Sequence, residues 1–264
     1  MLRPRLIVSL LVQGGRLTKT VGFGPGKYVG DPLNAVRIFN EKNVDELLVV
    51  DIDATVKGTE PDYRLLESLA VESRMPLGYG GGVRTVEQAS RIVQLGVEKV
   101  AVSAAAIADP SLVGRLAEPL GRQSVVAVLD VRRDASGVPM VFTHNGTRPT
   151  GREAVGLARE LEAAGAGEIL VNSIDRDGSM QGYDLELAAS IRAAVEVPIT
   201  ILGGAGKFPD FEALVRRCGI VGAGAGSYFV FKGVHRAVLI SYPDRGRRRE
   251  LSALAQAATT PSAA

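Results

Sequence analysis

The sequence predicts an α/β barrel in which eight parallel strands alternate with helices. Short apolar runs rich in β-branched residues recur along the chain, and each is followed by a longer stretch with apolar residues at helical spacing. Strongly apolar strands that alternate with amphipathic helices are typical of a parallel sheet covered by helices. Eight such units within 264 residues favour a closed barrel over an open sheet.

The expected strands leave room for a helix after each of them. They are Leu6–Val12, Glu46–Asp51, Pro76–Tyr79, Glu98–Ser103, Val125–Val131, Glu168–Ser173, Ile199–Leu202 and Ile220–Ala223. The clearest helical patterns are Pro32–Asn43, Val86–Leu95, Pro110–Leu120, Arg152–Ala164 and Leu185–Val195. A glycine-rich stretch from Gly14 to Gly30 follows the first strand and is long enough to form a mobile lid.

The two halves of the chain resemble each other, which indicates a duplication within one barrel. The run Glu46–Asp53 lines up with Glu168–Asp175 at an offset of about 122 residues. At the same offset Pro76–Gly82 lines up with Pro198–Gly204. We therefore expect two fused half-barrels in a single domain, because neither half could close a barrel alone.

The barrel domain is expected to occupy residues 1–244, with half-barrels at about 1–122 and 123–244. Residues 245–264 begin with a cluster of arginines and end in Ala, Ser and Thr. This composition predicts a flexible tail with a short helix at most. The arginine cluster is typical of a solvated terminus.

The composition excludes several classes of protein. Thirty-one basic against 29 acidic side chains leave a formal net charge of +2, so the chain lacks the basic excess of proteins that bind nucleic acid or anionic membranes. The single Cys218 cannot form an internal disulfide and no Cys/His cluster has the spacing of a zinc site, so we expect a cytoplasmic protein with no metal and no cofactor. The apolar run Leu6–Val12 is too short for a signal sequence or a membrane span.

Glycine runs follow the third and seventh expected strands, at the barrel end where reactive groups lie. Gly80–Gly82 and Gly203–Gly206 would let backbone N–H groups approach an anion closely. The small residues Ser103–Ala105 and Ala225–Ser227 would complete each pocket. A single glycine run is as typical of a tight turn as of a phosphate site, but the symmetric pair predicts a ligand with a phosphate at each end.

Three aspartates at strand ends are candidates for acid–base chemistry. Asp130 ends the fifth strand, and Asp175 and Asp177 follow the sixth. A carboxylate in a water-poor mouth can have its pKa raised toward neutrality and then transfer protons, whereas the alternative role is a loop cap or a salt bridge. The counterpart of Asp130 in the first half is Leu11, so a symmetric acid–base pair is absent. Lys19 either swings over the mouth or is simply exposed to solvent.

Charges of alternating sign begin four of the expected strands, at the opposite end of the barrel. These residues are Arg5, Glu46, Lys99 and Glu168. They could meet as a ring of salt bridges that plugs the barrel. Their spacing alone favours a ring that only stabilises this face.

Together these features resemble the cyclase subunit of imidazole glycerol phosphate synthase, a duplicated (β/α)8 TIM barrel of histidine biosynthesis. The resemblance runs from Leu2 to about Tyr242. The segments that carry it are Gly30–Pro32, Asp45–Leu47, Gly80–Val83, Gly121–Ser124, Gly165–Ile169, Ser173–Gly178 and Gly182–Leu185.

In that family a glutaminase partner makes ammonia, which passes through the barrel to a bis-phosphate ribosyl substrate at the C-terminal mouth. The resemblance implies that the four charges form an ammonia gate under a glutaminase docked on the N-terminal face, which replaces the purely stabilising interpretation. It also implies that Asp130 is the base-type aspartate and Lys19 the lid lysine. The implied phosphate-site residues are Gly82, Ser103, Gly178, Gly203, Gly204, Gly226 and Ser227.

Three positions depart from the family pattern. Leu11 stands where an acid-type aspartate is usual, Leu202 where a serine is usual, and Ala104 where a hydroxyl residue is usual. A leucine cannot transfer a proton, and the loss of a positioned general acid typically costs roughly two to four orders of magnitude in rate. The resemblance therefore leaves cyclisation in question.

Other segments look more like a paralogous branch that is associated with acetamidino modification of bacterial surface sugars. They are Met1–Arg5, Lys27–Asp31, Asn34–Asn40 and Phe229–Gly233. That branch works with its own glutaminase and a separate sugar amidotransferase, which implies an ammonia conduit with changed chemistry at the mouth. Two alternatives remain. One is a histidine-pathway cyclase in which Asp130 shares the proton work with Asp175 or Asp177, and the other is a non-catalytic activator of the glutaminase.

Overall fold

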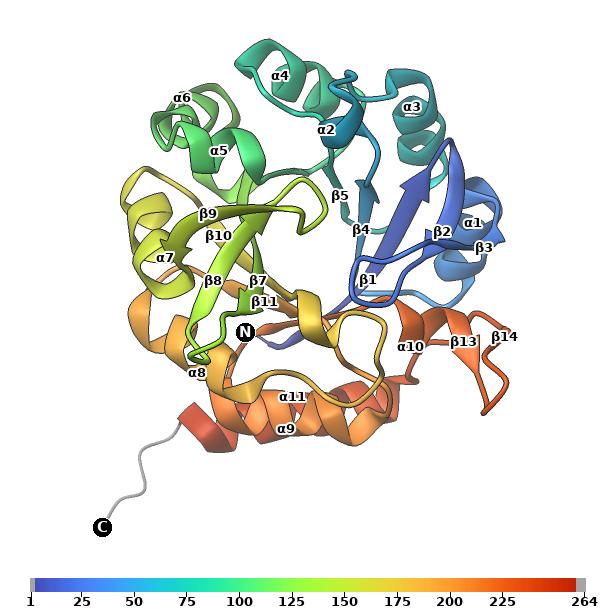
Figure 1. Cartoon of the computed structure of the whole chain (residues 1–264). Coiled ribbons are helices and arrows are strands. Elements are labelled where there is room, and N and C mark those ends of the chain that lie inside the picture. Colours follow the sequence, from blue (N-terminus) through green and yellow to red (C-terminus); the bar gives the residue numbers. More distant parts are fainter. Residues whose placement is uncertain (1–2, 260–264) are drawn as a thin grey trace.

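The computed structural model describes residues 3–259 and has a closed ring of eight parallel strands at its centre (Figure 1). In ring order the strands are β1 (Arg5–Gln13), β4 (Glu46–Asp51), β5 (Leu77–Gly80), β6 (Lys99–Val102), β7 (Val125–Arg133), β10 (Glu168–Ser173), β11 (Ile199–Leu202) and β12 (Gly222–Ala225). The parallel pairing of β12 with β1 closes the ring. The predicted (β/α)8 barrel is confirmed, and each predicted strand overlaps one of these eight.

Helices surround the barrel on its outer side (Figure 1). The main ones are α1 (Pro32–Glu41), α3 (Tyr63–Glu72), α4 (Val86–Gln94), α6 (Ser111–Leu120), α7 (Ala154–Ala163), α8 (Leu185–Ala194), α9 (Phe208–Cys218) and α11 (Arg245–Thr259). Side-chain caps fix where several of them begin. The Asp31 carboxylate accepts from the backbone N–H of Asn34, and the Thr85 hydroxyl accepts from that of Gln88.

Short elements complete the connections. They are the helices α2 (Ala54–Lys57), α5 (Ala104–Ala108), α10 (Ser227–Val230), η1 (Arg122–Ser124) and η2 (Ile174–Arg176), and the strands β2 (Arg16–Lys19), β3 (Lys27–Gly30), β8 (Pro139–Thr143), β9 (Arg148–Glu153), β13 (Phe231–Lys232) and β14 (Ala237–Val238). The glycine-rich segment expected as a lid contains β2 and β3. Strand β2 pairs antiparallel with β1, and β3 pairs antiparallel with β2. Its mobility stays a prediction.

The segment expected to be a flexible tail differs from that expectation, because residues 245–259 form the helix α11. Leu251 is 2% exposed and Ala255 is 1% exposed, and α11 packs beside α9 (Figure 1). Arg248 on α11 also forms an ion pair with Asp45 at 3.1 Å. The ring of helices therefore continues past residue 244, while residues 260–264 lie outside the described range. The division into half-barrels stays a prediction.

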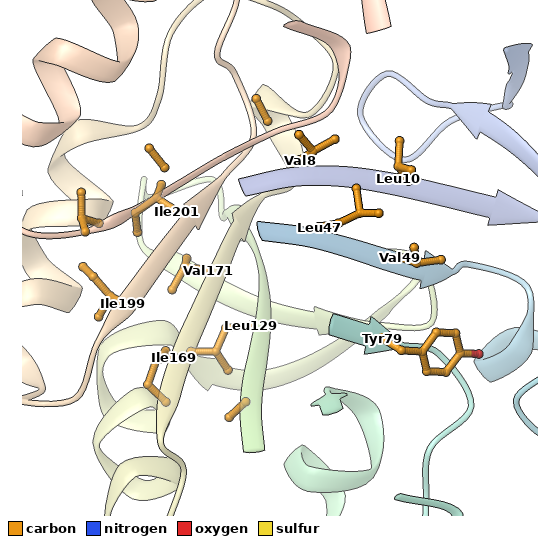
Figure 2. Packing of buried hydrophobic residues seen from close by; sticks show 14 of the residues in the cluster. Val8, Leu10, Leu47, Val49, Tyr79, Leu129, Ile169, Val171, Ile199 and Ile201 are labelled. Carbon is orange, nitrogen blue, oxygen red and sulfur yellow. The ribbon is translucent and has the colours of Figure 1, made fainter. Parts of the chain in front are cut away.

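Two apolar sets follow from the alternation of side chains along each strand. Outward-facing residues such as Val8, Leu47 and Ile169 pack against the helices (Figure 2). Inward-facing residues form a second cluster inside the barrel. Its buried members are Ile7, Leu48, Ala101, Val126, Leu170 and Leu202.

Candidate functional site

A cavity of about 550 Å³ opens at the carboxyl ends of the barrel strands. Strand ends and the loops that follow them line it, as is usual in this fold. The predicted site residues that line it are Lys19, Gly82, Ser103, Asp130, Asp177, Gly178, Gly203, Gly204, Gly226 and Ser227. The structure therefore brings nearly all of the predicted mouth residues together.

Asp130 projects into the mouth from β7, in register with Asn172 on β10. Burial raises the pKa of Asp130 to about 7, although a hydrogen bond from Asn172 acts in the opposite direction, and the charge of Asp177 adds to the rise. Burial also raises the pKa of Asp177, whose carboxylate accepts a hydrogen bond of 2.8 Å from the Thr20 hydroxyl. Two carboxyl groups with raised pKa values therefore face the same cavity.

Lys19 is buried at 6% exposure, so the solvent-exposed interpretation is wrong. Its ammonium group donates to the backbone oxygen of Ser9 at 2.6 Å. It lies so close to Gly226 that a side chain at that position would displace the end of Lys19. Burial lowers the pKa of Lys19 to about 8, against the attraction of Asp177. Lys19 is thus a potential proton donor or anion ligand within the mouth.

Asp175 does not join the other acidic groups. Its side chain is 49% exposed, and it does not line the cavity. It accepts a hydrogen bond from the backbone N–H of Arg133 at 3.2 Å and lies 3.6 Å from the guanidinium of Arg132. These contacts match the alternative role of a loop cap and surface ion pair.

The two predicted phosphate pockets lie on opposite sides of the strand ring. Gly82 and Ser103 follow β5 and β6, whereas Gly203 and Gly226 follow β11 and β12. At Gly203 φ is +92°, and an added Cβ would lie 2.6 Å from the Ser173 backbone oxygen, so this close approach requires glycine. A ligand with a phosphate at each end would span the mouth between the two pockets.

Several cavity residues were not predicted from the sequence. Asn172 is one, although it lies two residues after inward-facing Leu170 on the same strand and the alternation could have identified it. His144 and Asn145 also line the cavity, from the turn between β8 and β9, where their φ values are +54° and +55°. The sequence feature that could have identified them is the run His144–Asn145–Gly146, which is typical of a turn.

Apolar side chains from several strands also line the mouth. They are Leu11 on β1, Val50 on β4, Val128 on β7 and Leu202 on β11. Residues 3–259 contain no group of three or more His, Cys, Asp or Glu side chains that could hold a metal ion. Besides Asp130, Asp177 and Lys19, the groups at the mouth that can exchange protons include Asp51 and His144. Burial raises the pKa of Asp51 as well.

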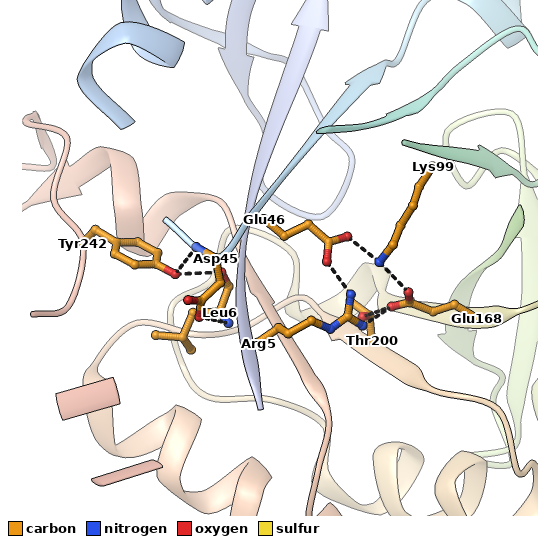
Figure 3. A network of polar contacts seen from close by, with 8 residues as sticks. All are labelled: Arg5, Leu6, Asp45, Glu46, Lys99, Glu168, Thr200 and Tyr242. Atoms are coloured by element: carbon orange, nitrogen blue, oxygen red, sulfur yellow. Dashed lines mark hydrogen bonds and ion pairs between the residues drawn. The ribbon is translucent and has the colours of Figure 1, made fainter. Parts of the chain in front are cut away.

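The four charges at the other end of the barrel form a closed ring (Figure 3). Arg5 pairs with Glu46 and, at 2.7 Å, with Glu168. Lys99 pairs with Glu46 at 2.8 Å and with Glu168 at 2.9 Å. Burial would raise the pKa of Glu168, but the charges of Arg5 and Lys99 outweigh it and hold that pKa below its usual value. Glu168 is therefore ionised at neutral pH.

The inward-facing apolar cluster lies between this ring and the mouth. Leu48, Ala101, Leu170 and Leu202 belong to that cluster and also line the cavity. Such a lining disfavours an ion, which would lose its hydration without gaining a partner, more than it disfavours an uncharged molecule.

The sequence of the chain matches a family model described as histidine biosynthesis protein over residues 5–235. The chain belongs to this family. Members of the family with the HisF name are subunits of imidazole glycerol phosphate synthase, so the predicted family is confirmed. No helix among residues 3–259 is long and apolar enough to cross a membrane.

Relatives of the HisF type match almost the whole chain. One from Leptospira interrogans is 54% identical over 252 residues, which cover 95% of this chain and 99% of the relative. Another from Pseudomonas aeruginosa is 50% identical over 244 residues, which cover 92% of this chain and 97% of the relative. Both carry the synthase-subunit name provisionally. The imidazole glycerol phosphate synthase subunit HisF of Limosilactobacillus fermentum is 40% identical over 233 residues, which cover 88% of this chain and 89% of that subunit.

Proposed function

We propose that this chain conducts ammonia from a glutaminase subunit docked on its N-terminal face to the phosphate-binding mouth. The observation that supports this most directly is the order of three layers inside the barrel, from the charged ring through the apolar cluster to the cavity. A closed ring of four charges is followed by an apolar cluster, and four residues of that cluster line the cavity. Entry into this apolar interior would cost a hydrated ion far more free energy of desolvation than it would cost neutral ammonia.

We further propose that the ammonia serves the synthesis of an acetamidino sugar, through a separate sugar amidotransferase, and that the mouth binds a phosphorylated small molecule. Leu11 and Leu202 support changed chemistry at the mouth, because neither side chain can donate a proton or a hydrogen bond to a ligand. The higher identity to the provisionally named relatives than to the Limosilactobacillus fermentum subunit supports a paralogous branch, which is the part of the proposal that the relatives bear on.

The alternative function is cyclisation in histidine biosynthesis. Asp130 favours it, because a buried carboxyl group with a pKa near 7 is suited to general-base catalysis at neutral pH. Under this alternative Asp177 and Lys19 would supply the acid function that Leu11 cannot.

The conduit is tested in a reconstituted system of glutaminase, this chain and the amidotransferase. Lys99→Ala and Glu168→Ala disrupt the ring and are expected to lower glutamine-dependent product formation while ammonium-dependent product formation is retained. The matched control is Lys57→Ala, which removes an exposed ion pair with Asp53 away from the barrel interior. An equal response of the two nitrogen sources to the ring variants would contradict a route through the barrel.

A further inference from the structure

The charged ring has a fifth polar contact, from Thr200 on β11. The Thr200 side chain is fully buried, and its hydroxyl donates a hydrogen bond to Oε1 of Glu168. The same Oε1 accepts from Arg5, and Oε2 accepts from Lys99. Glu168 therefore has three side-chain partners, which come from three different strands.

Glu46, the other carboxylate of the ring, is held by fewer groups. Its partners are the cations Arg5 and Lys99, which it shares with Glu168 (Figure 3). The hydrogen bonds described for the ring give Glu46 no neutral donor that corresponds to Thr200. The two carboxylates have similar exposure, so the difference between them lies in the number of donors rather than in burial.

Gly222 provides the space for this arrangement. Gly222 on β12 lies in register with Thr200 on one side and with Arg5 on the other. A Cβ atom at position 222 would overlap the Thr200 hydroxyl. Because that position has no side chain, Thr200 and Arg5 both reach Glu168 although β12 separates their strands.

We propose that Thr200 is a positioning residue of the gate, which fixes Glu168 so that the ring opens at Glu46. This inference rests on the proposed ammonia conduit. A ring of four alternating charges must break a pair in order to open, and the carboxylate with fewer donors breaks away at lower cost. Glu168 then keeps its position, and Arg5 and Lys99 pair with it again when the ring closes.

The first test needs neither a partner nor a substrate. The side-chain carboxyl of Glu168 is titrated by carbon-13 NMR in the intact chain and in the variants Thr200→Val and Thr200→Ser. Valine has the shape of threonine without the hydroxyl, so we expect the pKa of Glu168 to rise by on the order of one unit. Serine retains the hydroxyl and should keep the wild-type value. An unchanged pKa in Thr200→Val would overturn the proposal.

Carbon relaxation in the same samples measures which carboxylate moves. We expect millisecond exchange at Glu46 but not at Glu168 in the wild-type chain, and exchange at both in Thr200→Val. Exchange at Glu168 in the wild type would contradict a stationary role. Thr200→Ala gives the same comparison if the valine variant fails to fold.

The reconstituted system then tests the effect on transfer. Thr200→Val should lower the amount of product formed per glutamine hydrolysed severalfold, leave the ammonium-driven rate unchanged, and be rescued by Thr200→Ser. Unchanged coupling in Thr200→Val while Lys99→Ala lowers it would refute the positioning role alone. If neither variant affects coupling, the conduit itself is wrong.

Discussion

The ammonium group of Lys19 donates a hydrogen bond of 2.6 Å to the backbone oxygen of Ser9, which ties β2 back onto β1 at the mouth. Burial lowers the pKa of this lysine to about 8, whereas an unfolded lysine has a pKa of about 10.4. Between these values the unfolded chain binds more protons than the folded one. The free energy of unfolding contributed by Lys19 therefore rises with pH across this window.

We expect Lys19→Met to remove this rise. Urea unfolding at about pH 7.5 and about pH 9.5 measures the difference for the wild type and the variant. Lys27→Met is the control, because Lys27 lies on β3 of the same hairpin and is exposed. If the free energy of unfolding still rises with pH in Lys19→Met, another group causes the rise.

Asp130 has the opposite pH dependence. Its folded pKa of about 7 exceeds the usual value of 3.8, so the folded chain binds more protons between these values and the free energy of unfolding falls as pH rises. Asp130→Asn should flatten this fall and make the protein more stable than the wild type at about pH 8. Asp175→Asn, at an exposed carboxylate outside the cavity, is the matched control. Thermal unfolding across the pH range measures both variants.

Leu11 limits the chemistry of the mouth. Under the proposed function the wild-type chain should not turn over the bis-phosphate ribulosyl substrate with ammonium, because Leu11 cannot donate a proton. Leu11→Asp should introduce activity, with a gain of about two orders of magnitude or more over the wild type. Leu11→Asn is the matched control, since it is polar but has no acidic proton. Turnover by the wild type at the rate of ordinary cyclases would instead support the alternative function.

The helix α11 should contribute to stability as part of the barrel. Leu251→Ala removes a fully buried side chain and should cost about 2–4 kcal/mol in the free energy of unfolding. Ala253→Ser, at an exposed position on the same helix, should change it by less than about 0.5 kcal/mol. Similar unfolding curves for the two variants would mean that α11 does not pack on the barrel in solution.

The barrel could be predicted from the sequence because its strands are buried on both faces and therefore appear as short apolar runs. The ring and Asp130 could be placed because each lies at one end of such a run. Strands β8 and β9 were missed, since the exposed residues of Arg148–Glu153 give no apolar alternation. The helix α11 was missed because its arginines outnumber its two buried side chains, Leu251 and Ala255.

The candidate site was harder to predict where it depends on chain reversal. Asp175 and Asp177 lie two residues apart, but the short helix η2 separates their side chains, so that only Asp177 faces the cavity. The burial of Lys19 depends on the return of β2 along β1, and the spacing of glycines alone does not specify it. The hydrogen bond from Thr200 requires the absence of a side chain at Gly222, which is a relation between neighbouring strands rather than a motif.

A single strand links the two ends of the molecule. Alternate residues of β1 supply Arg5 to the charged ring, Ile7 to the apolar cluster, the Ser9 oxygen that holds Lys19, and Leu11 to the mouth. The six residue steps from Arg5 to Leu11 span about 20 Å, and an extended backbone stretches little along its axis. A small axial displacement of β1 by a protein bound near Arg5 would therefore move the Ser9 oxygen that holds Lys19, and the Leu11 side chain, by a similar amount. Strand β1 would in this way transmit a displacement at the docking face to the mouth.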